Sequence, residues 1–261
     1  MTNNQQNLTN YDACSADYDN RYTAGPTGVA EILQSLAEKT MARAVLEAGC
    51  GTGHWLDQLQ GIPEKFGLDL SQGMLMQAGK KGAGMNLVRG EATRLPFLPR
   101  SFDFIYCIHA VQHFSSPSLF IKEVHRLLRP GGALAIIGMD PHGNRGHWYV
   151  YDYFAGTYEA DLLRYPSADN LAKVMQEEGM ERCALMQGAS LQYDFRGKEV
   201  FADPVLHKNG VSQLALLSEE DFARGMERIR AAIATGGETG EEIIFPARIS
   251  LPAVVGFAPP L

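Results

Sequence analysis

The sequence has 261 residues and a formal net charge of −7, with a sequence pI of about 5.5. This length suits one large domain or one domain with an added lobe. Hydrophobic residues make up 45% of the chain, which provides a substantial core and argues against wholesale disorder. The acidic balance argues against a general binder of nucleic acid or anionic membranes, because both ligands attract clustered Lys and Arg.

The cysteines and the N-terminal segment point to a reducing compartment. Cys14, Cys50, Cys107 and Cys183 are widely separated and form no C-x-x-C, which disfavours a zinc ribbon, a redox dithiol or a disulfide scaffold. Residues 1–10 are polar and uncharged, so we expect them to be frayed and to be no signal peptide. No apolar run approaches the ~20 residues that span a bilayer. We therefore expect a cytoplasmic protein without membrane insertion.

Strand and helix patterns alternate in the first half of the chain. Helical spacing occurs in segments 28–39, 54–60, 71–81 and 116–128, the last ended by Arg129-Pro130-Gly131-Gly132. Strand-like runs lie between them at 44–49, 65–70, 85–91, 102–108 and 132–138. The alternation predicts βαβ units and a mostly parallel sheet, which binds ligands outside the carboxyl ends of its strands.

The pattern changes after about residue 140. The segment 148–165 is rich in aromatic residues, and Tyr149, Tyr153 and Phe154 occupy related helical positions. We interpret this segment as a core helix over the sheet in preference to a wall around a flat or cationic ligand. Further along, the patterns predict helices at 167–180 and 219–234 and strands at 183–195 and 241–259.

The most specific local feature is the sequence EAGCGTG at 47–53, which follows a strand and opens a helix. Glycine allows the backbone N–H groups of such a turn to approach a ligand closely. A dinucleotide fingerprint would be G-x-G-x-x-G, but here His54 occupies the place of the third glycine. Asp69 lies at the end of the next strand, where a carboxylate can accept both hydroxyl protons of a ribose.

Five ordered segments of the sequence resemble the motifs of a known protein family. The segments VLEAGCGTGHW, GLDLSQGML, GEATRLPF, FDFIYCIHAVQHF and LLRPGGALAI follow, in order, the motifs of class I S-adenosylmethionine-dependent methyltransferases. The resemblance covers about residues 40–140 and is strongest to the small-molecule branch often labelled methyltransferase type 11. The segment YDACSADYDNRY also resembles the Tyr-Asp repeat that precedes the fold in this branch.

The resemblance implies a set of cofactor-binding residues along the strand ends. Glu47, Gly49, Cys50 and Gly51 would surround the methionine moiety. Asp69 would bind the ribose hydroxyls, and Leu70 would pack on the adenine. Glu91 and Ala92 would contact the adenine amino group. Cys107 and Ile108 would line the site at the end of the fourth strand. Glu91 stands where the family commonly has Asp, so its reach is longer.

The N-terminal segment supplies three further candidates by the same resemblance. Tyr11, Tyr18 and Arg21 would close over the cofactor. An arginine at this place can pair with the cofactor carboxylate. For Tyr18, ordinary packing of an N-terminal helix is an equally good interpretation.

Two histidines are the candidates for proton transfer. Methyl transfer from a sulfonium is an in-line displacement, so the protein mainly supplies positioning and exclusion of water. A general base is needed only where the acceptor must lose a proton. His109 and His113 lie just after the fourth strand, where the acceptor should approach, and an imidazole suits a base at neutral pH. The alternative is a structural histidine packed at the top of the sheet.

The sequence also argues against several alternative functional sites. His109 and His113 have the i, i+4 spacing of zinc ligands, but Ala110 stands where the protease pattern needs Glu, so we predict no metal. The sequence lacks G-x-S-x-G, a P-loop, Tyr-x-x-x-Lys and the Asn-Pro-Pro-aromatic motif typical of enzymes that methylate nucleic-acid bases. His142 and His147 lie in a loop that often borders the acceptor pocket, and we interpret them as solvated.

We therefore predict an α/β, Rossmann-like fold with a seven-stranded, mostly parallel sheet, helices on both faces and a partly helical cap. Residues 1–261 would form one methyltransferase domain: a cap at 1–39, the cofactor core at 40–140, an acceptor cap with an insertion at 141–240 and a final strand at 241–261. The predicted function is methyl transfer from S-adenosyl-L-methionine to a small organic acceptor, by a monomer or homodimer that binds no nucleic acid. O- or N-methylation is favoured over C-methylation. A non-catalytic S-adenosylmethionine-binding regulator and a nucleotide-dependent oxidoreductase remain open.

Overall fold

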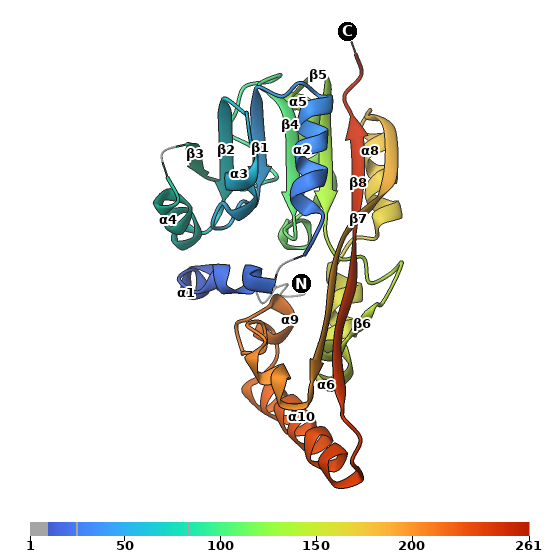
Figure 1. Cartoon of the computed structure of the whole chain (residues 1–261). Helices are drawn as coiled ribbons and strands as arrows, with labels where there is room; N and C mark the ends of the chain where they lie inside the picture. Colours follow the sequence, from blue (N-terminus) through green and yellow to red (C-terminus); the bar gives the residue numbers. More distant parts are fainter. Residues whose placement is uncertain (1–9, 25, 83, 261) are drawn as a thin grey trace, which may run out of the picture.

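The computed structural model describes residues 10–24, 26–82 and 84–260, so nearly all of the segment expected to be frayed lies outside the described residues. Its centre is a mixed sheet with the strand order β3-β2-β1-β4-β5-β8-β6, and β7 also pairs with β8 (Figure 1). The fold class is confirmed. The sheet has eight strands in the described chain where seven were predicted, because the short β6 (His147–Trp148) adds to β8.

The parallel half of the sheet contains the predicted strands. They are β1 (Ala44–Ala48), β2 (Glu64–Asp69), β3 (Met85–Arg89), β4 (Phe102–Ile108) and β5 (Leu128–Ile137). All five residues of β1 are buried, as expected for a central parallel strand covered on both faces. The strand order reverses between β1 and β4, and the crevice at such a point is where open α/β sheets bind ligands.

Helices cover both faces of this half. Apolar residues of α2 (Val29–Lys39) and α3 (His54–Gln58) pack on one face, and those of α5 (Pro117–Leu127) and α8 (Ala168–Glu177) pack on the other. The helix α4 (Gln72–Lys80) begins as predicted, with the Ser71 hydroxyl accepting from the Met74 N–H. Most boundaries in this half differ from the prediction by two residues or fewer, and the largest difference is at β5. This strand begins at Leu128 and not at residue 132, directly after α5, because Leu128 pairs with Phe102 across a register shift.

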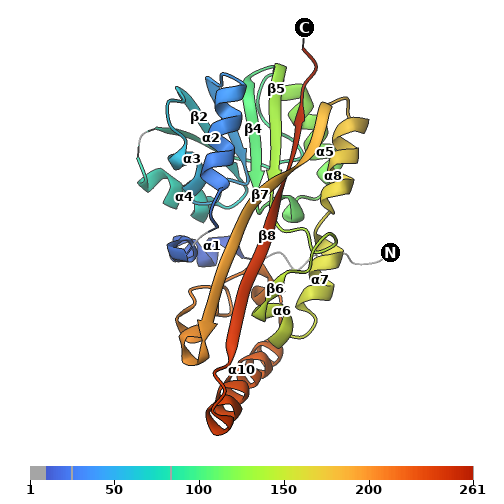
Figure 2. The same ribbon diagram turned by 45° about the vertical axis from the view of Figure 1, so that its right-hand side comes forward.

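The antiparallel half extends well beyond the parallel strands. The strands β7 (Glu181–Arg196) and β8 (Ile244–Phe257) pair along nearly their whole length, and Figures 1 and 2 show them running past the parallel strands toward α10. The segment between them carries three helices: η3 (Gly197–Ala202), α9 (Ser212–Ala215) and α10 (Glu219–Thr239). The helices α6 (Tyr149–Tyr153) and α7 (Thr157–Arg164) pack beside this extension.

The N-terminal segment lies at the carboxyl ends of the parallel strands. It comprises α1 (Tyr11–Cys14) and η1 (Tyr18–Ala24), and Figure 1 shows α1 across that end of the sheet. Within the described ranges, no helix is both long enough and apolar enough to cross a bilayer. The four cysteines are all unpaired thiols.

The glycine at the end of β1 gives a test of the fold. Gly49 has a φ of 74°, and a Cβ there would lie 2.5 Å from the Cβ of Ala110. Gly49→Ala should lower the free energy of unfolding by about 3 kcal/mol in urea denaturation, from left-handed strain and the clash together. The control is Gly237→Ala, an exposed position in α10 with open space around it, which should be stabilising by about 0.5–1 kcal/mol. Equal stabilities of the two variants would contradict the packing described for the turn.

Candidate functional site

The turn after β1 is anchored to the neighbouring strand and leaves room beside its second glycine. The N–H groups of Gly49 and Cys50 both donate to the carbonyl of Leu68, at 2.8 and 3.0 Å. Gly51 has a φ of 51°, and the nearest atom to a Cβ built there is Tyr18 Cε1 at 3.9 Å. The turn therefore presents its backbone to a space between itself and the N-terminal segment.

Asp69 holds this turn from the end of β2. Its Oδ2 accepts from the Gly51 N–H at 2.8 Å and its Oδ1 accepts from the Ser71 N–H at 2.8 Å. Burial raises the pKa of the Asp69 carboxyl, and these backbone donors oppose that effect. A carboxylate has about four acceptor positions, so the backbone donors leave room for a ligand hydroxyl. This arrangement fits the ribose role expected of Asp69.

Glu47 is a buried acid at the same end of the sheet. Its side chain is 1% exposed, and its Oε2 accepts from the Tyr106 hydroxyl at 3.4 Å. Burial raises the pKa of Glu47 well above its ordinary value. No Lys, Arg or His of the described segments forms an ion pair with it. A cationic group on a ligand would stabilise this carboxylate, as the ammonium of a methionine moiety would.

The remaining predicted cofactor residues fall into two groups. The side chains of Cys50, Cys107 and Ile108 are buried in the core, so only their backbones can face a ligand. Leu70 is 63% exposed beside Asp69. Glu91 is exposed, and its Oε1 accepts from the hydroxyls of Thr93 and Ser115, while the side chain of Ala92 is buried. The roles of these residues toward adenine stay predictions.

Two acidic residues tie the N-terminal segment over this end of the sheet. Asp12 Oδ1 accepts from the Ser71 hydroxyl at 2.6 Å and from the Gly73 N–H at 2.7 Å, at the N-terminus of α4. Asp19 forms an ion pair with Lys81 at 2.6 Å and accepts from the Thr52 hydroxyl. The segment is thereby fixed to both the glycine turn and α4.

Tyr18 and Arg21 form one unit within this segment. The guanidinium of Arg21 lies 3.5 Å from the centroid of the Tyr18 ring, and its Nε donates to the Tyr18 carbonyl at 3.1 Å. Arg21 makes no ion pair with any residue in the part of the chain that is described. Its charge therefore remains available to an anionic group such as a carboxylate.

His113 is joined to the N-terminal segment by a hydrogen bond. The Tyr11 hydroxyl and His113 Nε2 are 2.8 Å apart, and the Gln112 amide lies 3.2 Å from the same nitrogen. Burial raises the pKa of Tyr11 well above its ordinary value, so its hydroxyl keeps its proton and can donate to Nε2 in the imidazole tautomer protonated at Nδ1. Burial, with the charges of Arg164 and His109, lowers the pKa of His113 to about 4. The imidazole is therefore neutral at pH 7.

His109 occupies a strained position at the end of β4. Its φ is 49°, in the left-handed region, where His is more common than most residues other than Gly. Its N–H donates to the Ile137 carbonyl at 2.9 Å, and its own carbonyl accepts from the Gln112 amide at 2.8 Å. Burial and the charge of Arg21 lower its pKa to about 4. Gln112 thus links the two histidines.

A hollow of about 1030 Å³ lies beside this edge of the sheet. The two histidines and Gln112 line one part of it, and Tyr11, Tyr18 and Arg21 line another. Side chains of the β7–β8 extension and of segments 203–205 and 211–213 complete it. In the described chain, the glycine turn and Asp69 lie outside this hollow, so the predicted cofactor and acceptor places are adjacent and share the N-terminal segment.

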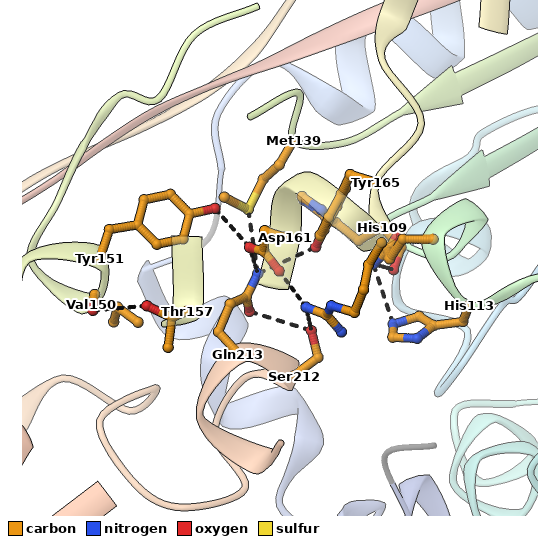
Figure 3. A network of polar contacts seen from close by, with 12 residues as sticks. His109, His113, Met139, Val150, Tyr151, Thr157, Asp161, Tyr165, Ser212 and Gln213 are labelled. Carbon is orange, nitrogen blue, oxygen red and sulfur yellow. Dashed lines mark hydrogen bonds and ion pairs between the residues drawn. The ribbon is translucent and has the colours of Figure 1, made fainter. Parts of the chain in front are cut away.

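A buried polar network supports the wall opposite the histidines (Figure 3). Asp161 Oδ2 accepts from the Tyr151 hydroxyl at 2.7 Å and from the Gln213 amide at 2.6 Å, and Asp161 also forms an ion pair with Arg164. Tyr165 lies at the edge of this network, with its hydroxyl 3.4 Å from the Gln213 amide. The network joins α7 to α9 and fixes Gln213 and Tyr165, which both line the hollow.

The aromatic segment serves both purposes considered for it. Tyr149 and Phe154 are fully buried in the core, as predicted. Trp148 and Tyr165 line the hollow. Sequence reasoning missed Asp161, Asp203 and Gln213, which come from segments without a motif; a lone acid within an apolar run was the only available signal.

The two histidines of the segment after β5, His142 and His147, do not line the hollow. The His142 ring nitrogen Nε2 lies 2.9 Å from the Tyr165 carbonyl, and His147 is exposed at the start of β6. In the described segments, no group of three His, Cys, Asp or Glu side chains has the arrangement of a metal site.

Comparisons with known proteins identify a domain within the chain. Residues 46–136 match the family model described as "Methyltransferase domain". The chain contains a class I methyltransferase domain, of the S-adenosylmethionine-dependent kind. The resemblance drawn from the five sequence motifs is thereby confirmed.

Relatives and solved structures agree with this assignment. The chain is 29% identical to a malonyl-[acyl-carrier protein] O-methyltransferase of Enterobacter lignolyticus, over 60% of the chain and 71% of the relative. It is 36% identical to a phthiotriol/phenolphthiotriol dimycocerosates methyltransferase of Mycobacterium leprae, over 41% of the chain and 42% of the relative. A putative methyltransferase from Anabaena variabilis has the same fold at a TM-score of 0.63 and 20% identity, over 86% of this chain and 96% of that one. The chain spans 29–42% of the length of the first curated relatives that it matches.

The two histidines give a pH prediction. Because the folded pKa values of about 4 lie below the ordinary 6.5, the folded protein binds fewer protons than the unfolded chain between those pH values. The free energy of unfolding should therefore fall as the pH drops from 6.5 toward 4. In urea denaturation at pH 7 and pH 4.5, a His109→Gln, His113→Gln variant should lose about 5 kcal/mol less than the wild type, about half from each histidine. The buried carboxyl groups, whose raised pKa values act in the opposite direction, contribute equally in both proteins. Their contribution to the unfolding free energy therefore cancels in the comparison. Equal losses would show that the histidines are not held neutral.

Proposed function

We propose that this protein transfers the methyl group of S-adenosylmethionine to a hydroxyl or amine of a small organic acceptor. The observation that carries the proposal is the position of the neutral His109 and His113, which line a hollow beside the glycine turn and Asp69. When bound, the cofactor supplies an activated methyl group on a sulfonium. The chain's own residues then bind, orient and exclude water.

The cofactor would lie along the carboxyl ends of β1 and β2. Asp69 would accept the ribose hydroxyls through the acceptor capacity left by its backbone bonds. The methionine ammonium would face the buried carboxylate of Glu47, and the methionine carboxylate would face Arg21. Leu70 offers an exposed apolar surface beside Asp69 for the adenine ring. Each proposed contact thus matches a charge or surface that is otherwise incompletely satisfied.

Tyr11 and His113 would carry the proton of the acceptor. Tyr11 lines the hollow, and its hydroxyl lies 2.8 Å from His113 Nε2, to which it can donate. An acceptor hydroxyl can donate to Tyr11 Oη while the Tyr11 proton moves to Nε2, which leaves an imidazolium and a more nucleophilic acceptor oxygen. The acceptor oxygen would then face the activated methyl group that S-adenosylmethionine supplies when bound. The same relay accepts a proton from an ammonium group, so the arrangement supports O- or N-methylation.

The named relatives support a small-molecule acceptor. Among them are O-methyltransferases for malonyl-[acyl-carrier protein] and demethylmenaquinone methyltransferases. The net charge of −7 also disfavours nucleic acid as the acceptor. We further infer that the protein acts in the cytoplasm, as a monomer or homodimer. The four unpaired cysteines support the reducing compartment only.

A ligand panel tests the cofactor. S-adenosylhomocysteine should raise the melting temperature of the full chain at concentrations above its Kd, because it binds the folded state alone, whereas NAD should leave it unchanged. Stabilisation by NAD without stabilisation by S-adenosylhomocysteine would replace this proposal by a nucleotide-dependent oxidoreductase. Stabilisation by S-adenosylhomocysteine without methyl transfer to any acceptor would indicate a non-catalytic regulator.

Two substitutions test the proton relay. His113→Ala and Tyr11→Phe should each lower kcat on the order of a hundredfold while leaving the Kd for S-adenosylhomocysteine unchanged, because each removes one member of the relay. His147→Ala, at an exposed position away from the hollow, is the control and should retain full activity. Unchanged kcat in His113→Ala would remove this histidine from proton transfer.

A further inference from the structure

Asp203 is a buried carboxylate on the wall of the hollow. It follows η3, is 9% exposed and lines the hollow together with Pro204 and Val205. Its Oδ1 accepts from the Val205 N–H at 3.0 Å, and its Oδ2 accepts from the Tyr149 hydroxyl at 2.8 Å. Two of about four acceptor positions are thus in use, and the others remain for a ligand.

The ion pairing of Asp203 differs from that of Asp161, the other buried acid near this wall. Asp161 forms an ion pair with Arg164, whereas Asp203 forms none with any cation in ranges 10–24, 26–82 and 84–260. Burial accordingly raises the pKa of Asp203. A buried carboxylate without a cation is costly, so a cationic partner at this place would be strongly favoured.

Aromatic rings pack around Tyr149, the hydrogen-bond partner of this carboxylate. The Tyr149 ring meets the rings of Phe195 and Phe245 edge to face, with centroids 6.2 and 6.3 Å apart. Tyr193 and Phe195 of β7 line the hollow on the same strand face as Leu191. Aromatic faces attract organic cations, and a carboxylate among them adds a full opposite charge. The surroundings therefore suit an ammonium group on an apolar body.

The position of Asp203 separates it from the histidines. Gly138 packs beside His109 and donates to the Pro252 carbonyl of β8. Trp148, the residue before the Asp203 partner Tyr149, pairs with Ala247 of the same strand. Five residues of strand, about 17 Å, lie between these two levels. A ligand that reaches both ends of the hollow must therefore be elongated.

We propose that Asp203 binds a protonated amine at one end of an elongated, apolar acceptor whose other end receives the methyl group beside His113. This inference rests on the proposed function, because it names the class of acceptor that the same hollow takes. The amine at Asp203 is an anchor and takes no part in methyl transfer. A neutral or anionic molecule of the same shape would leave the carboxylate without a counter-charge, so Asp203 sets the specificity.

A matched pair of probes tests the anchor. The probes are 4-phenylbutylamine and 4-phenylbutan-1-ol, which share one apolar body and differ in a single end group. Calorimetric titrations at pH 7, with and without saturating S-adenosylhomocysteine, should show that the wild type binds the amine at least about tenfold more tightly than the alcohol. Asp203→Asn should abolish this preference. Tyr149→Phe, which keeps the carboxylate, and Asp169→Asn, at an exposed position on α8, should retain it.

The outcomes separate this inference from the proposed function. Equal affinity of the wild type for both probes, or binding of neither, would overturn the role of Asp203. A preference that persists in Asp203→Asn would do the same. If Asp203→Asn does not fold, the wild type and Tyr149→Phe decide the question through the same pair of affinities. Failure of S-adenosylhomocysteine to bind, with the amine preference intact, would contradict the proposed function and leave the amine site standing.

Discussion

The carboxylate of Asp69 is the interaction on which the arrangement of the site depends. One oxygen accepts from the glycine turn after β1, the other accepts from the residue that opens α4, and the Asp69 carbonyl accepts from the Gly90 N–H after β3. Three chain segments are thus held at one end of the sheet. The parallel register of β1, β2 and β3 brings these ends together, and positive φ angles at the glycines leave their backbone facing a ligand.

The acceptor side of the site depends on elements outside the parallel sheet. The paired strands β7 and β8 extend beyond it and supply one wall of the hollow, and the segment between them supplies another through Asp203 and Gln213. The N-terminal segment closes the gap between this hollow and the glycine turn, fastened by Asp12 and by the Tyr11–His113 bond. Cofactor chemistry and acceptor recognition therefore come from different parts of the chain, which meet at Tyr18 and Arg21.

The sequence predicted the cofactor half well because its signals are local. Strand periodicity, the positive-φ glycines and the Ser71 cap each depend on a few neighbouring residues, and the motif order located Asp69 and the histidines. For the acceptor half, the sequence predicted helices and strands but not which of their residues line the hollow. Whether Trp148 lines a cavity while Tyr149 lies in the core depends on the pairing of β6 with β8, a contact across about a hundred residues. The bond between Tyr11 and His113 and the isolation of Asp203 depend on similarly distant contacts, which periodicity does not encode.

Calorimetric titration of S-adenosylhomocysteine into the wild type and Asp69→Asn tests the central claim most directly. Asn keeps the shape of the side chain and one acceptor oxygen for the turn, but it removes the charge that would hold the ribose hydroxyls. We predict that the wild type binds S-adenosylhomocysteine and that Asp69→Asn binds it at least about tenfold more weakly, with a circular dichroism spectrum unchanged from the wild type. Equal affinity of the two proteins, or no binding by the wild type, would contradict the account.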